Sequence, residues 1–80
     1  MNSLDKQKQE DYKAITWIWH LFRDYGDITN LEKDDQRWDD IVRSADKFGL
    51  EHQEARKLIA GALMALEYRA KKNGAREVAA

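Results

Sequence analysis

Apolar residues recur at spacings of three and four along most of this chain, which is the pattern of amphipathic helices. Gly26, Gly49 and the pair Asn73-Gly74 interrupt the pattern. Glycine readily adopts the left-handed conformation that closes a helix C-terminus, so each is expected to stop a helix. The sequence therefore predicts three helices, over about Glu10 to Tyr25, Leu31 to Phe48 and Glu51 to Lys72.

The first predicted helix has one main apolar face with further apolar residues on its flank. The face consists of Tyr12, Ile15, Ile18, Trp19 and Phe22, and the flank of Ala14, Leu21 and Tyr25. The main face is expected to enter the core. Trp17 falls about opposite Ile15, beside polar residues. It is expected either to form part of a binding surface, where tryptophan is enriched, or to lie on a neighbouring loop or the N-terminal tail.

The second predicted helix separates an apolar face from an acidic one. Thr29 and Glu32 have the spacing of a capping box, in which each side chain satisfies a free backbone amide of the first turn. Asp27 or Asn30 could cap the helix instead. The apolar face is formed by Leu31, Trp38, Ile41, Val42, Ala45 and Phe48. The acids on the other face indicate a solvated helix surface.

The third predicted helix is apolar on two sides, because the nine residues from Leu58 to Leu66 include no charged or hydroxyl side chain. One face consists of Ala55, Leu58, Ile59, Ala62, Leu63 and Leu66, and the other of Gly61, Met64, Ala65 and Tyr68. Such a helix is expected to be central. Either the first two helices cover both faces, or a second copy covers Gly61, Met64, Ala65 and Tyr68, joined by Trp17 and Leu21.

The composition favours an all-α protein, since the 80 residues include no proline and only four glycines. We expect one compact three-helix domain over residues 1–80, with a long central C-terminal helix and loose tails at 1–9 and 75–80. A chain of this size buries only about 60% of the surface that its unfolded form exposes. The absence of cysteine excludes disulfides, which leaves self-association or good packing as sources of further stability.

Charge is divided along the chain although the net charge is only −1. Residues 28–54 contain four basic and eight acidic residues, whereas residues 55–80 contain six basic and two acidic residues. These blocks of opposite sign can attract each other within the fold or present two differently charged surfaces to partners.

Residues 41–58 resemble a DNA-binding helix-turn-helix motif. The resemblance rests on Ala45, Gly49, Leu50, Ala55 and Leu58. It implies that Gln53, Arg56 and Lys57 would contact DNA. Ser44 and Ala55 depart from the residues usual in the motif, and the third helix is about twice as long as a typical recognition helix. Glu51 and Glu54 would face the phosphates, which opposes DNA binding.

No catalytic, cofactor or metal site is expected. His20 is interpreted as a surface partner of Asp24 and His52 as a partly buried structural residue, and neither has a companion nucleophile in the pattern. The chain has neither a signal-peptide core nor an apolar run long enough to span a membrane, so a cytoplasmic location is expected. The sequence favours a small non-enzymatic protein-interaction module that associates with itself as a homodimer, through exposed aromatic residues or through the acidic face of the second helix. Helix-turn-helix DNA binding is the alternative.

Overall fold

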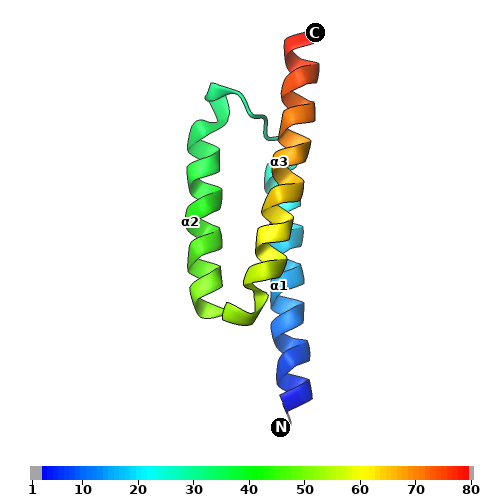
Figure 1. Ribbon diagram of the computed structural model, residues 1–80, viewed down its shortest axis with the longest axis vertical. Coiled ribbons are helices and arrows are strands. Elements are labelled where there is room, and N and C mark those ends of the chain that lie inside the picture. The colour runs from blue at the N-terminus through cyan, green and yellow to red at the C-terminus, as the bar shows by residue number, and fades with distance from the viewer. Residues whose placement is uncertain (1–2, 80) are drawn as a thin grey trace.

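The computed structural model describes residues 3–79 and is all-α, as the sequence predicts. The three helices are α1 (Ser3–Tyr25), α2 (Asp35–Glu51) and α3 (Arg56–Ala79), and short 3-10 turns, η1 (Glu32–Asp34) and η2 (Gln53–Ala55), precede α2 and α3. Figure 1 shows that α1 and α3 run side by side in the same direction, with α2 antiparallel to both.

The molecule is elongated, with extents of 54 × 18 × 17 Å. The N-terminal end of α1 and the C-terminal end of α3 project from opposite ends of the three-helix body (Figure 1). Loose tails were expected at residues 1–9 and 75–80, but the chain is helical from Ser3 to the end of α1 and up to Ala79 in α3. Residues 1, 2 and 80 lie outside the described part of the chain.

Glycine does not stop the second and third helices. Gly49 lies inside α2 and Gly74 inside α3, and no glycine in the described chain has a positive φ. Gly74 serves a different purpose, because a Cβ at this position would come within 2.1 Å of Asn30 Oδ1. It lets α3 approach the connection that precedes α2. At Gly26, directly after α1, a Cβ would lie 2.4 Å from the Phe22 carbonyl oxygen, so this turn requires glycine without a left-handed φ.

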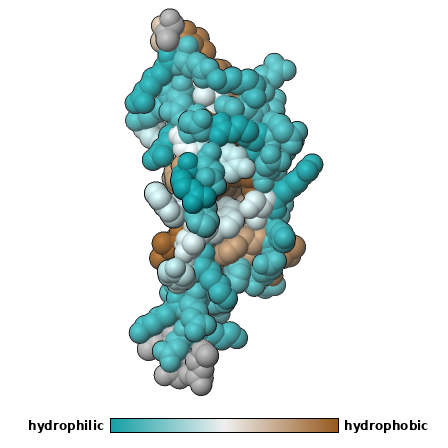
Figure 2. Space-filling model, turned by 180° about the vertical axis from the view of Figure 1, so that it is seen from behind, coloured by the Kyte–Doolittle hydropathy of each residue, from teal (hydrophilic) through white to brown (hydrophobic). Residues whose placement is uncertain are grey.

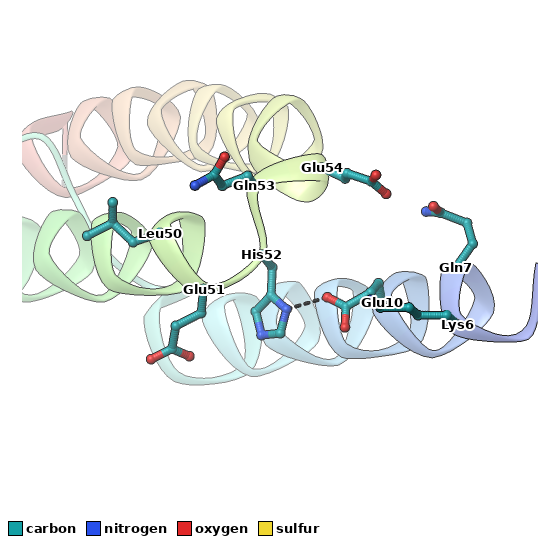
Figure 3. A pocket seen from close by; sticks show the side chains of 8 residues that line it. All are labelled: Lys6, Gln7, Glu10, Leu50, Glu51, His52, Gln53 and Glu54. Atoms are coloured by element: carbon teal, nitrogen blue, oxygen red, sulfur yellow. Dashed lines mark hydrogen bonds and ion pairs between the residues drawn. The ribbon is translucent and has the colours of Figure 1, made fainter. Parts of the chain in front are cut away.

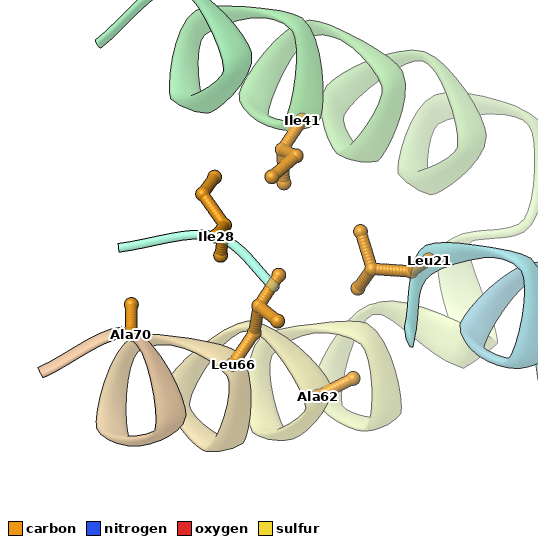
Figure 4. Close-up of a cluster of buried hydrophobic side chains, with 6 residues drawn as sticks. All are labelled: Leu21, Ile28, Ile41, Ala62, Leu66 and Ala70. Atoms are coloured by element: carbon orange, nitrogen blue, oxygen red, sulfur yellow. The ribbon is translucent and has the colours of Figure 1, made fainter. Parts of the chain in front are cut away.

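The core is formed where all three helices meet the connection between α1 and α2 (Figure 4). Ile28, Ile41 and Leu66 are its largest fully buried side chains. The rest of the cluster consists of Leu21, Ala62 and Ala70. Ile28 belongs to no helix, so the connection itself contributes to the core.

The expected core face of α1 is wrong for three of its five residues, whereas Ile18 and Phe22 do pack against the core. Ala14 and Leu21, expected on the flank, are buried, whereas Tyr12, Ile15 and Trp19 are exposed. Because α1 is apolar around more than half its circumference, periodicity alone fits either side. The neighbouring helices α2 and α3 decide the phase, since Leu21 faces both Ile41 and Leu66 in the core.

Polar groups hold the connection between α1 and α2 in place. Asp34 is 6% exposed, and its Oδ2 accepts hydrogen bonds from Thr29 N at 2.8 Å and from Thr29 Oγ1 at 2.5 Å. The predicted capping box joined Thr29 to Glu32, but Glu32 is exposed, and neither η1 nor α2 begins with a side-chain cap hydrogen bond. Trp38 Nε1 donates to Thr29 O at 2.9 Å. Asn73 Nδ2 of α3 donates to the carbonyl oxygens of Gly26 and Ile28 at 3.2 and 2.9 Å.

Arg37 completes these contacts from α2. Its guanidinium pairs with Asp27 at 2.7 Å and Asp34 at 3.4 Å, and donates to the Asp24 carbonyl oxygen at 3.1 Å. The hydrogen bonds from Thr29, and then the neighbouring Arg37, lower the pKa of Asp34 below its ordinary value of 3.8, against the opposing effect of burial. The ionised carboxylate is therefore the form that stabilises the fold.

Replacing Asp34 with Asn is expected to lower the free energy of unfolding by about 1–3 kcal/mol. The buried side chain then keeps only one acceptor oxygen, whereas Asp34 uses Oδ2 for both Thr29 hydrogen bonds and Oδ1 for Arg37. The contribution of Asp34 is fully present above its ordinary pKa of 3.8 and is lost as the pH falls through its lower pKa in the folded protein. Urea unfolding at pH 7 and at decreasing pH measures both effects. Asp35→Asn, at the exposed neighbouring position, is the control and should change stability little. Equal stability of the two variants would contradict this role.

Candidate protein-interaction surface

One side of α3 is exposed and apolar along its middle. Gly61, Met64, Ala65 and Tyr68, singled out from the sequence, are all exposed, and Leu58 extends the same side toward the start of the helix. Met64 and Tyr68 are 70% and 63% exposed. A Cβ at Gly61 would meet no atom within 4 Å. Within the described chain, α1 and α2 therefore leave this side of α3 uncovered.

A second exposed apolar stripe lies on α1. Tyr12, Ile15 and Trp19 are 72%, 61% and 61% exposed and follow one another at helical spacing. The stripe continues to Phe22, which is half-buried against α3. The sequence pattern assigned these residues to the core and so missed them as surface residues. The signal that could have identified them is the width of the apolar sector of α1, which exceeds what one core-facing side requires.

The stripes of α1 and α3 lie on the same side of the molecule. The Arg69 guanidinium lies over the Phe22 ring, 4.9 Å from the ring centre. Phe22 also lines a groove together with Ala65 and Tyr68. Since Trp19 precedes Phe22 on its helix face by three residues, it flanks this groove. We call the combined surface the α1/α3 apolar face: Tyr12, Ile15, Trp19, Leu58, Gly61, Met64, Ala65 and Tyr68. In the view from behind, Figure 2 shows brown and near-white side chains gathered in the middle of the molecule between mostly teal ends.

Two residues expected on this surface lie elsewhere. Leu21 is 5% exposed and belongs to the core. Trp17 is half-buried on the α2 side of α1, where its ring stacks on Phe48 at 5.5 Å and its Nε1 donates to Ser44 Oγ at 3.2 Å. Trp17 therefore joins α1 to α2, and Trp19 is the tryptophan that faces solvent.

Charge differs between the groove beside Phe22 and the hollow at the turn between α2 and α3. At the end nearer the C-terminus, Arg69, Lys72 and Arg76 line the groove beside Phe22, and Lys72 lies 4.7 Å from the Tyr68 ring centre. At the opposite end, Glu10, Glu51 and Glu54 surround an open hollow of about 550 Å³ together with His52 (Figure 3). The groove has no acid among its lining residues, and the hollow has one lysine, Lys6.

His52 connects the turn before α3 to α1. Its Nδ1 contacts Glu10 Oε2, and its ring packs against Phe48 at 4.4 Å. This hydrogen bond is the main cause that lowers the pKa of Glu10 below its ordinary value of 4.5. No group of three or more potential metal-ligating side chains occurs among residues 3–79. His52 is partly buried, as the sequence predicts.

The predicted DNA-contacting residues lie around the turn between α2 and α3. Arg56 Nε donates to the Gly49 carbonyl oxygen at 3.2 Å, so Arg56 has an internal partner. Gln53 lines the acidic hollow, and Lys57 is exposed. The helices α2 and α3 form an antiparallel hairpin (Figure 1), whereas a DNA-binding helix-turn-helix crosses its helices at about 90–120°.

The pKa of Glu10 is expected to be measurably below 4.5 in the intact protein, because His52 hydrogen-bonds to its ionised form. In the His52→Leu variant, which removes the donor, the pKa should return toward 4.5. Carboxyl ¹³C chemical shifts recorded against pH by NMR measure the value directly. Asp34, whose pKa is lowered by Thr29 and Arg37 and not by His52, is the reference carboxyl and should titrate alike in both proteins. An unchanged Glu10 titration would show that this contact is not formed in solution.

No helix in the described part of the chain is long and apolar enough to cross a membrane. Comparison with protein-family models, with curated proteins and with solved structures found no match to this chain.

Proposed function

We propose that this protein is a small, non-enzymatic protein-interaction module that associates with itself through the α1/α3 apolar face. The observation that carries the proposal is the exposure of six large apolar side chains on this face, between 48% and 72%, in a chain of 80 residues. Large exposed apolar patches on small proteins are typical of interaction sites. Three of the six are aromatic, and aromatic residues are enriched in the centres of interfaces.

The exposed area is large enough for a stable pair. Because side chains of this size have full areas of roughly 150–250 Å², the six expose on the order of 800 Å². A standard interface buries about 800 Å² on each partner. Covering the face would also add apolar burial to a domain whose own core consists of only a few large side chains.

The helix-turn-helix alternative gains less support from the arrangement of its residues. Arg56 is held by a backbone carbonyl group, and Glu51 and Glu54 stand beside Gln53. DNA affinity comes largely from basic side chains that displace counterions from the phosphates. The exposed cations of the C-terminal half of α3 lie far along the helix from residues 41–58.

Self-association is expected to be visible at about 100 µM protein by light scattering or sedimentation, a concentration that populates dimers of micromolar affinity. Trp19→Ser and Tyr68→Ser should each weaken the dimer at least about tenfold, because each removes a large apolar contact. Val42→Ser is the matched control, since Val42 is 50% exposed on α2. Circular dichroism verifies that each variant is folded. A wild-type protein that stays monomeric at about 1 mM would overturn the proposal.

Random duplex DNA at low salt tests the alternative function. The interaction module is expected to show no binding that falls steeply with rising salt, which is the signature of counterion release. Fluorescence anisotropy of a labelled duplex measures this, with Lys57→Glu as the comparison. Salt-dependent binding that Lys57→Glu abolishes would favour the DNA-binding function instead.

A further inference from the structure

The exposed side of α3 carries a seven-residue repeat. Starting in the η2 turn, exposed positions follow one another at alternating spacings of four and three, which is the 3.5-residue repeat by which two helices pack along a seam. These positions are Glu54, Leu58, Gly61, Ala65, Tyr68 and Lys72. The buried residues Ile59, Ala62 and Leu66 form a separate stripe toward the core. Ala65, Tyr68 and Lys72 of the repeat line the open groove beside Phe22 and remain exposed.

The repeat is symmetric about residue 63. Leu58 and Tyr68 are equally far from that point, as are Gly61 and Ala65, and so are Glu54 and Lys72. When two identical helices pack antiparallel around a two-fold axis, residues equally far from the crossing point face each other. Each pair then matches in kind: an aliphatic with an aromatic side chain, two small residues, and an acid with a base.

We propose that the partner of the α1/α3 apolar face is a second copy of this chain, with the two α3 helices antiparallel and centred on residue 63. The arrangement rests on the self-association proposed above and specifies its geometry. Tyr68 of one copy packs on Leu58 of the other, and Lys72 pairs with Glu54. Ile15 and Trp19, beside α3 on the same face, add apolar area next to this seam.

Gly61 supports this geometry because its lack of a side chain has no use within one copy. A glycine in a helix interior costs stability relative to alanine, and a Cβ at Gly61 would meet open space. Opposite Ala65 of a second copy, the same glycine lets the two helix axes approach to about 8 Å, the short end of the usual range. The stability that Gly61 costs the single helix is thus offset by the close contact it permits between two chains.

Charge favours the antiparallel direction over the parallel one. A parallel pair would bring the two basic ends together, each with Arg69, Lys72 and Arg76. An antiparallel pair places Lys72 against Glu54 of the partner and sets only Arg69 near a basic residue, Lys57, so fewer like charges meet. Like charges facing each other across an interface are unfavourable, so the complementary direction is preferred.

Cysteine cross-linking tests the direction, because the chain has no cysteine of its own. A disulfide forms only where the two Cα atoms lie within about 7 Å. We expect an oxidised mixture of Glu54→Cys and Lys72→Cys proteins to give the mixed covalent dimer, and neither protein alone to cross-link. Lys71→Cys is the matched control: it is adjacent in sequence but lines the groove toward α2, so it should not react with Glu54→Cys.

Each outcome has a definite meaning when light scattering is recorded on the same samples. Cross-linking of each single variant with itself would show a parallel pair and overturn the arrangement while leaving self-association intact. A dimer in solution that forms no covalent dimer in any mixture would show that another surface pairs, and would also overturn it. A monomer in solution would overturn the proposed function itself.

Charge reversal gives a second, independent measurement on proteins without cysteine. Lys72→Glu and Glu54→Lys are each expected to weaken the dimer about fivefold, because each sets like charges opposite each other at both ends. The double variant should return to within about twofold of the wild type, since both pairs are restored with exchanged signs. In a parallel pair each of these residues would face its own copy, so like charges would already be opposed in the wild type, and neither single variant would weaken the dimer. Gly61→Leu should abolish the dimer and leave the circular dichroism spectrum unchanged.

Discussion

Ile28 lies between the three helices although it belongs to none of them, and the contacts around it fix how the helices are placed. The connection that carries it is anchored by Asp34 at the end of η1, by Arg37 and Trp38 of α2 and by Asn73 of α3. Buried backbone groups in a loop need such partners, since water no longer reaches them. Here, side chains of two helices supply them, so a single short segment sets the distance of α2 from both α1 and α3.

Most of the architecture follows from the sequence because apolar periodicity is strong and helix-breaking residues are rare. Helix number, the end of α1 at Tyr25 and the central position of α3 were predicted on that basis and are confirmed. The phase of α1 was not, because its apolar sector is wide enough to fit two orientations. The prediction that Gly74 ends a helix was wrong because this glycine makes room for Asn30, which is 44 residues away in the sequence. Local sequence rules do not reveal such a contact.

The α3 part of the candidate surface was predicted from the sequence, and the α1 part was not. Gly61, Met64, Ala65 and Tyr68 stood out because α3 is apolar on two sides and three helices cannot cover every side of each other. Trp17 and Trp19, two positions apart on α1, exchanged roles once the phase of that helix was known. Trp17 is used to join α1 to α2 through Phe48 and Ser44, which leaves Trp19 to face solvent. The rotation of α1 about its axis thus decides both which of its residues enter the core and which face solvent.

The parallel course of α1 and α3 has a further electrostatic consequence. Each helix carries a dipole with its positive end at the N-terminus. In this up-down-up arrangement α2 offsets the dipole of one long helix and leaves that of the other unbalanced. The acids near the start of α3 and the bases along its C-terminal half oppose this remaining dipole. Whole side-chain charges exceed the half charge at each end of a helix, so one copy of the chain stays polarised along its length, and two antiparallel copies would cancel that polarisation.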